Sequence, residues 1–151
     1  GLSIISLLLV IYQSSTTSKL FYTDYMRYQQ DVTMSNKISY KIENMGFSDS
    51  PKVPVAVIGY HQTEFEKPTM EGGESLGASF FSWDAYSEYG CTQRILGFMK
   101  TLGYKYKLPD LQQMKKAKEF SNTLPSWPNK DSVQYDEKDD IIVIKLSDPV
   151  N

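Results

Sequence analysis

Trp83 and Asp84 close the most unusual stretch of the sequence, residues 74–84, in which three aromatic side chains stand among small residues. A flat aromatic ring can stack on the apolar face of a sugar, while a carboxylate accepts hydrogen bonds from the sugar hydroxyls. The pattern therefore indicates carbohydrate binding. The simpler interpretation is structural: Phe80, Phe81 and Trp83 fill the core, and Asp84 caps a turn.

Arg94 lies near the start of a predicted helix, where a positive charge gains nothing from the helix dipole. An acidic partner such as Asp84 would explain this position, although a solvated arginine is the simpler account. Tyr60 and His61 stand where a predicted buried strand leads into a polar loop, residues 61–74, and open α/β sheets place binding crevices at that end of a strand. The predicted glycan-binding residues are Trp83, Asp84, Arg94, Tyr60 and His61.

The groups needed for catalysis or metal binding are scarce. One cysteine, Cys91, and one histidine, His61, exclude an intrachain disulfide, a cysteine zinc site and an HExxH site. A dyad of these two residues lacks an orienting motif. Four loop carboxylates could form the acid pair of a hydrolase, but a solvated loop is the favoured interpretation; they are Glu64, Glu66, Glu71 and Glu74. We predict no catalytic residue, no metal and no cofactor.

The elements that must position these residues form one small domain. Residues 53–58 are a nearly unbroken β-branched run, typical of a strand that is buried on both faces. We expect this strand to be central in a small sheet, with a C-terminal hairpin, residues 133–146, beside it. Amphipathic helices at 92–102 and 110–120 would cover the sheet. The fold class is α/β, with α+β also open.

Residues 2–12 are apolar on all sides and carry no charge, which does not fit an amphipathic surface helix. The run is shorter than the roughly 20 residues that cross a bilayer, but the chain begins with Gly1 rather than Met, so we favour a truncated transmembrane segment. A buried core element and the apolar region of a signal peptide are the alternatives. An exposed apolar end could also drive self-association.

Residues 13–46 are expected to form a long helix or stalk, ended by Gly46. Polar residues 13–18 could cap a new helix or bend the old one. Side chains that recur at helical spacing form a semi-apolar stripe, which should face a neighbouring element. The members of the stripe are Phe21, Tyr25, Tyr28, Val32, Ser35, Ser39 and Ile42. Residues 47–151 complete the chain as a small α/β domain, and a net charge of −2 argues against nucleic acid as a partner.

Six strings of the sequence together carry a family resemblance. They are RYQQDVTMSNKISYKI, VPVAVIGY, GASFFSWD, RILGFMKTLGY, LPSWPNKDSV and IIVIKLS. With the apolar start, they resemble the carboxyl-terminal extracytoplasmic region of bacterial glucosyltransferase GtrII-like membrane proteins. The resemblance implies a multi-span cell-membrane protein that transfers glucosyl units from a lipid-linked donor to a cell-surface glycan. None of these strings is a catalytic signature.

Three functions remain open at this point. The first is a non-catalytic accessory domain of a membrane glucosyltransferase, with the rest of that protein, a surface glycan or a lipid-linked sugar as partner. The second is a stand-alone glycan- or protein-binding module. The third and weakest is a carboxylate-dependent hydrolase.

Overall fold

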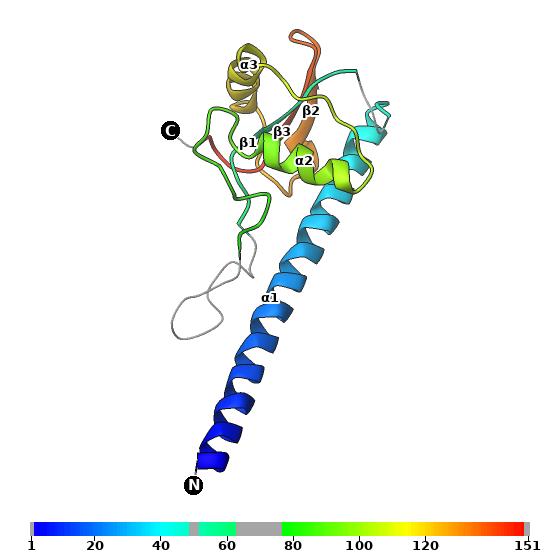
Figure 1. The fold of residues 1–151 in the computed structure, drawn as a ribbon. Coiled ribbons are helices and arrows are strands. Elements are labelled where there is room, and N and C mark those ends of the chain that lie inside the picture. The colour runs from blue at the N-terminus through cyan, green and yellow to red at the C-terminus, as the bar shows by residue number, and fades with distance from the viewer. Residues whose placement is uncertain (1, 49–51, 63–76, 150–151) are drawn as a thin grey trace.

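The computed structural model describes residues 2–48, 52–62 and 77–149. One long helix, α1 (Leu2–Asn44), ends in a head that contains a three-stranded sheet and two shorter helices (Figure 1). The strands are β1 (Val55–Ile58), β2 (Val133–Asp136) and β3 (Ile141–Lys145), and the helices are α2 (Thr92–Thr101) and α3 (Leu111–Ser121). A short 3₁₀ helix, η2 (Lys130–Ser132), precedes β2. The predicted α/β class is confirmed.

Helix α1 runs without a break through its 43 residues, a length of roughly 65 Å at ~1.5 Å per residue. The polar residues 13–18 do not interrupt it. Serine, threonine and glutamine cost at most about 0.7 kcal/mol each in a helix interior, and this segment contains neither Gly nor Pro. The helix ends as expected at Gly46, which has φ +92° and donates its N–H to the carbonyl of Glu43.

The face that α1 buries differs from the predicted semi-apolar stripe. Phe21, Tyr25 and Tyr28 are exposed, and of that stripe only Ser35, Ser39 and Ile42 are buried. The buried face instead consists of a polar lower part and an apolar upper part; it comprises Thr23, Arg27, Asp31, Met34, Ser35, Ile38, Ser39 and Ile42. A search for apolar periodicity misses this face because five of its eight residues carry charged or hydroxyl groups.

The sheet has the order β1-β3-β2, so β3 is the central strand and the predicted central position of residues 53–58 is wrong. Strand β3 pairs in parallel with β1 and antiparallel with β2, and the predicted hairpin is confirmed. All five residues of β3 are buried, as are all four of β1. Burial on both faces therefore does not distinguish the middle strand from the edge strand.

The outer edge of β1 is closed by other parts of the chain. The N–H of Val55 donates to the carbonyl of Lys107 at 3.0 Å. The hydroxyl of Thr92 accepts from the N–H of Val57 at 3.1 Å and donates to the carbonyl of Val57 at 2.9 Å. One threonine side chain thus occupies the place of a neighbouring strand, which explains how an edge strand can be entirely buried.

The head has three layers, with the sheet in the middle. Helix α2 and the end of α1 cover one face, where Ile38, Ile95 and Met99 pack against Val57 and Ile144. Helix α3 covers the other face, where its apolar side chains pack on the remaining sheet residues; that cluster contains Met114, Ala117, Ala56, Ile58, Ile141 and Val143. A capping box between Asp110 and Gln113 starts α3.

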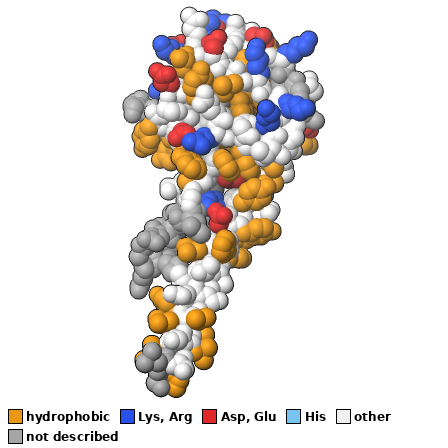
Figure 2. Space-filling model, in the orientation of Figure 1, with side chains coloured by type: hydrophobic (Ala, Val, Ile, Leu, Met, Phe, Trp, Pro, Cys, Tyr) orange, Lys and Arg blue, Asp and Glu red, His pale blue; other side chains and the backbone are white. Residues whose placement is uncertain are grey.

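The N-terminal part of α1 has no protein cover. Its apolar side chains from Ile4 to Tyr12 are between 56% and 69% exposed, so the alternative of a buried core element is wrong. Figure 2 shows hydrophobic side chains along the lower helix, whereas charged side chains lie mainly on the head. By length and composition α1 can cross a membrane, and the most apolar part of it is unburied. A membrane would give this surface the apolar surroundings that water lacks.

Candidate functional site

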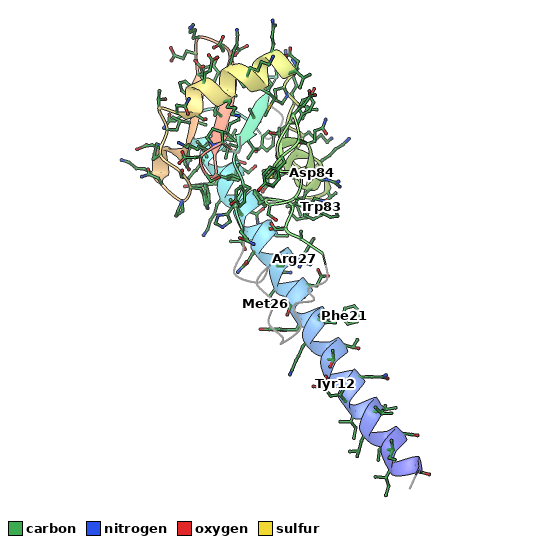
Figure 3. The ribbon with its side chains drawn as sticks, turned by 90° about the vertical axis from the view of Figure 1, so that its left-hand side faces the viewer. Tyr12, Phe21, Met26, Arg27, Trp83 and Asp84 are labelled. Atoms are coloured by element: carbon green, nitrogen blue, oxygen red, sulfur yellow. The ribbon has the colours of Figure 1, made fainter. Side chains whose placement is uncertain are left out.

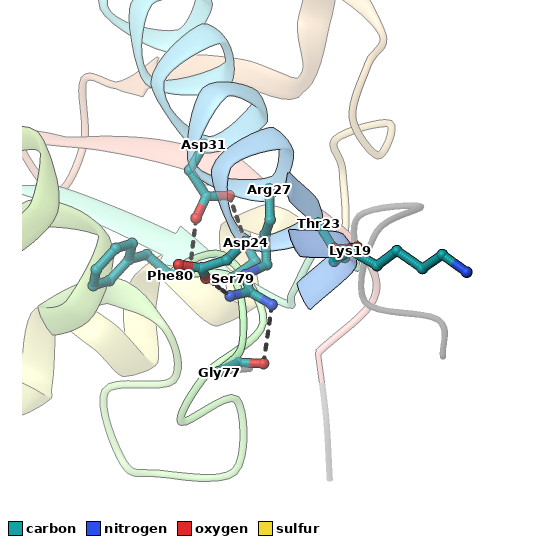
Figure 4. A network of polar contacts seen from close by, with 8 residues as sticks. All are labelled: Lys19, Thr23, Asp24, Arg27, Asp31, Gly77, Ser79 and Phe80. Carbon is teal, nitrogen blue, oxygen red and sulfur yellow. Dashed lines mark hydrogen bonds and ion pairs between the residues drawn. The ribbon is translucent and has the colours of Figure 1, made fainter. Parts of the chain in front are cut away.

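A polar clasp joins α1 to residues 77–81, the segment that leads into the predicted site (Figure 4). We define the clasp as Arg27 and Asp31 of α1 with Gly77, Ser79 and Phe80. The Asp31 carboxylate, 2% exposed, accepts from the Ser79 hydroxyl at 2.6 Å and from the Phe80 N–H at 3.0 Å. Arg27 donates to the carbonyl of Gly77 at 3.1 Å and pairs with Asp24.

The clasp has a structural rather than a chemical role. Both of its charged groups are buried and engaged, so neither is free to act on a substrate. Gly77 has φ +73°, and a Cβ there would lie 3.1 Å from the Arg27 guanidinium. Glycine adopts this positive φ without strain, and a side chain at this position would press on the Arg27 guanidinium. The clasp fixes the aromatic segment at one height on α1.

Trp83 and Asp84 lie on the head (Figure 3). Arg94 contacts both of them, and we call the three residues the Trp83 cluster. The Arg94 guanidinium lies 4.5 Å from the centroid of the Trp83 ring, and its Nε donates to Asp84 Oδ2 at 2.5 Å. Trp83 is 46% exposed, so the prediction that it fills the core is wrong. The expected acidic partner of Arg94 is confirmed as Asp84.

The neighbouring aromatic residues do fill the core, as predicted for them. Phe81 is fully buried, and Phe80 stacks on Phe98 with ring centroids 4.4 Å apart. Asp84 has φ +67°, in the left-handed region that residues other than glycine rarely adopt. Its side chain goes to Arg94 rather than to a turn N–H, so the predicted capping role of Asp84 is replaced by an ion pair.

A groove of about 640 Å³ runs along one side of α1, and we call it the α1 groove. Its polar groups are three amides, a hydroxyl, an ammonium and an imidazole, from Gln29, Gln30, Gln62, Thr33, Lys37 and His61. Its apolar groups are two thioethers and an indole, from Met26, Met34 and Trp127. Amides that both donate and accept, beside an aromatic ring, suit the hydroxyls and apolar faces of a sugar.

Trp127 is held firmly at the edge of this groove. Its backbone N–H donates to the carbonyl of Lys145 at 2.9 Å, and the Lys41 ammonium lies 4.8 Å from the centroid of its ring. Partial burial lowers the pKa of Lys41, and the Asp131 carboxylate offsets part of that decrease. The ring is half-buried and packs against the core.

The predicted site residues do not all meet in one place. His61 lines the α1 groove, and its backbone N–H donates to the carbonyl of Phe81 at 2.8 Å. Tyr60 is 39% exposed, and its N–H donates to the hydroxyl of Ser147. The Trp83 cluster does not line the groove. The loop carboxylates Glu64, Glu66, Glu71 and Glu74 lie outside the described residues.

Sequence reasoning missed Gln29, Gln30 and Gln62 as lining residues. The pair Gln29-Gln30 is visible in the sequence, but only the fold shows that this turn of α1 faces the chain as it leaves β1. Among residues 2–48, 52–62 and 77–149, no three His, Cys, Asp or Glu side chains are grouped to hold a metal ion.

No family model, curated protein or solved structure matches the chain. The resemblance to glucosyltransferase GtrII-like proteins thus rests on the quoted strings alone.

Proposed function

We propose that this chain is a glycan-binding accessory part of a membrane glucosyltransferase and has no catalytic activity of its own. The observation that carries the proposal is that a single unbroken helix provides both an exposed apolar segment and one wall of the α1 groove. A groove built on such a helix stays at a constant distance from the membrane that holds the helix. The glucosyl-transfer reaction of the parent protein and the extracytoplasmic location of the head are taken from the family resemblance.

The height of the groove supports the assignment to a surface glycan. At ~1.5 Å per residue, Gln29 lies roughly 25 Å beyond Tyr12 along the helix axis. If Tyr12 is at the lipid boundary, the groove is clear of the headgroups and within reach of a polysaccharide that leaves the membrane. The clasp keeps this geometry because Arg27 and Asp31 tie the head to α1.

Weak binding is sufficient for this role. An anchored domain and an anchored glycan share one surface, so the effective concentration of the glycan near the groove is high. Hydrogen bonds from amides to sugar hydroxyls contribute about 0.5 to 1.5 kcal/mol each, and contact with the exposed part of Trp127 adds to them. Together these contacts are consistent with millimolar affinity for an isolated oligosaccharide.

The Trp83 cluster is the second candidate surface for the same ligand. Its indole is exposed, and the pairing with Asp84 holds Arg94 in a fixed orientation in which its other N–H groups can meet hydroxyls. This was the location expected from the sequence. The α1 groove is preferred because it is a concave surface lined by amides and an indole, whereas the cluster lines neither this groove nor the smaller cleft at the end of β1.

NMR titration of the full chain in phosphatidylcholine nanodiscs tests the proposal. The probes are glucose and a purified bacterial cell-surface oligosaccharide. We expect the oligosaccharide to shift the side-chain amides of Gln29, Gln30 and Gln62 and the Trp127 indole N–H. The double variant Gln29→Ala/Gln30→Ala should weaken binding about fivefold or more, since two hydrogen bonds are lost.

The matched control is Gln112→Ala, which removes an exposed glutamine from α3 and should leave the affinity unchanged. Shifts confined to the Trp83 indole would mean that the glycan binds at the Trp83 cluster instead of in the α1 groove. The absence of any shift at tens of millimolar sugar, in a chain whose spectrum shows a folded head, would refute glycan binding.

A further inference from the structure

The lower part of α1 carries a line of exposed side chains at coiled-coil spacing. From Leu7 to Val32 they recur at alternating steps of four and three, which is the spacing of the a and d positions in a heptad. The apolar and aromatic members from Leu7 to Tyr28 are between 46% and 64% exposed. We call this line the α1 seam, and its members are Leu7, Ile11, Ser14, Ser18, Phe21, Tyr25, Tyr28 and Val32.

The α1 seam continues an interface that α1 already makes with the head. The same spacing goes on through Ser35, Ser39 and Ile42, and all three are buried. Tyr28 marks the transition, because its ring meets Phe98 of α2 edge-on with centroids 5.8 Å apart and yet stays 46% exposed. The head therefore covers the upper end of a surface whose lower end is open.

The α1 seam is uncharged along its whole length. The charged residues of this part of the helix, Lys19, Asp24 and Arg27, lie off the seam, and Asp24 pairs with Arg27 of its own chain. Phe21, a seam residue, projects from α1 below the head (Figure 3). When such a seam meets its own copy, it brings no like charges together.

The length of the seam restricts what can cover it. From Leu7 to Tyr28 it extends roughly 32 Å, from the apolar segment of α1 to the head. The partner must therefore be a helix that leaves the membrane at the same place, and α1 of a second copy is such a helix. One membrane holds two copies parallel and at the same height, so equal residues face each other. Leu7 at a d position with the β-branched Ile11 and Val32 at a positions favours two strands.

The head does not obstruct this pairing. At about 100° per residue, the seam lies roughly a third of a turn around α1 from Arg27, Asp31 and Ile38, which are buried under the head. The two heads of a twofold pair consequently lie on opposite sides of the paired helices. Gln30 and Thr33 of the α1 groove lie on a third side of the helix, so the pairing leaves the groove open.

The surface available to the pair is large enough for association. An aromatic side chain presents about 200 Å², and roughly half of each seam ring is open, so six rings from two copies bury about 600 Å². Ser14 and Ser18, four positions apart, let the two backbones approach closely. With the apolar members below them, these contacts bring the buried area toward the ~1,200 Å² at which stable interfaces begin.

We propose that the protein is a dimer in the membrane, in which the α1 seams of two copies form a parallel two-stranded coiled coil. The dimer carries two α1 grooves at the same height, which raises the avidity for a glycan with repeated units. The inference rests on the membrane anchoring that the proposed function also uses, but not on glycan binding.

Disulfide cross-linking of the full chain in phosphatidylcholine vesicles tests the pairing. Cys91 is the only cysteine and is buried, so the natural chain should not cross-link. With a water-soluble oxidant, Ser14→Cys and Ser18→Cys should form dimers about fivefold faster or more than Ser15→Cys, since equal seam residues face each other. Ser15→Cys is the matched control because it makes the same substitution one residue off the seam.

Energy transfer between labelled copies, measured over a range of protein-to-lipid ratios, gives the strength of the dimer. Phe21→Ala/Tyr25→Ala should weaken it about tenfold or more, because four rings leave the interface. Tyr12→Ala/Tyr22→Ala, which removes two exposed aromatic side chains off the seam, should have less than a twofold effect.

Three results would overturn the inference. Equal cross-linking rates at positions 14 and 15 would show random collision, and equal weakening by the two double variants would show nonspecific adhesion of aromatic side chains. A monomer at every protein-to-lipid ratio would mean that a helix of another protein covers the seam. None of these results bears on glycan binding in the α1 groove, which the NMR titration tests separately.

Discussion

Replacing Asp31 by alanine should detach the clasp and lower the free energy of unfolding of the head. The carboxylate accepts two hydrogen bonds in a site that is 2% exposed, from Ser79 Oγ and from the Phe80 N–H. Each buried donor left without an acceptor costs about 1 to 3 kcal/mol, so the loss of two acceptors in Asp31→Ala should destabilise the head by about 2 to 6 kcal/mol. Asp31→Asn keeps one acceptor oxygen and should lose about half as much.

Urea denaturation in mild detergent, followed by tryptophan fluorescence, measures this change because both tryptophans lie in the head. Asp24→Asn is the matched control on the same helix. The Asp24 side chain is 51% exposed, and its ion pair with Arg27 should contribute at most about 1 kcal/mol. If Asp31→Ala and Asp24→Asn lower the free energy of unfolding equally, Asp31 does not hold the head to α1.

Three further predictions concern single side chains. Thr92→Val should destabilise the head by about 2 to 6 kcal/mol in urea denaturation, because it leaves the buried N–H and C=O of Val57 unpaired. Thr92→Ser keeps the hydroxyl and should retain most of the stability. Equal losses in the two variants would refute the edge-closing role of Thr92. Ser35→Ala should raise Tm or leave it unchanged, since the Ser35 hydroxyl is buried without a partner in the described chain; a fall in Tm would mean that this hydroxyl is satisfied. The pKa of Lys116, measured by NMR titration, should exceed 10.5 and return toward that value in Asp139→Asn. The stability that the Lys116–Asp139 pair contributes is present below pH 10.5 and is lost as the pH rises through the folded-state pKa of Lys116. An unchanged pKa in the variant would contradict the pairing.

The elements of the fold were predictable where one local pattern dominates. Residues 92–101 and 111–121 carry amphipathic spacing, and the pair Asp110 and Gln113 has the residue types and spacing that mark the start of a helix. The hairpin of β2 and β3 follows from two short strands around an acidic turn. The order of the strands was not predictable, because β1 and β3 are equally apolar and β1 gains its edge cover from Thr92, a residue distant in sequence.

The candidate site was predictable only in part. An acidic partner for Arg94 could be inferred from its unfavourable place near the start of α2, and Asp84 is that partner. The exposure of Trp83, two residues after the buried Phe81, has no signal in the residue types of this segment. The α1 groove forms where one particular turn of a long helix faces the chain beyond β1. The clasp fixes which turn that is, and its contacts are polar, so no apolar periodicity in the sequence marks it.

The central claim is that the lower half of α1 anchors the head to a membrane. Measuring where that half of the helix lies tests the claim most directly. Cys91 is the only cysteine and is fully buried, so nitroxide labels can be placed at Leu8→Cys and at Gln112→Cys in the otherwise natural chain. In lipid vesicles, power-saturation EPR should show position 8 accessible to oxygen but not to a water-soluble nickel chelate. Position 112, on the head, should show the reverse. A label at position 8 that the nickel chelate reaches as readily as one at position 112 would contradict the membrane-anchored accessory domain.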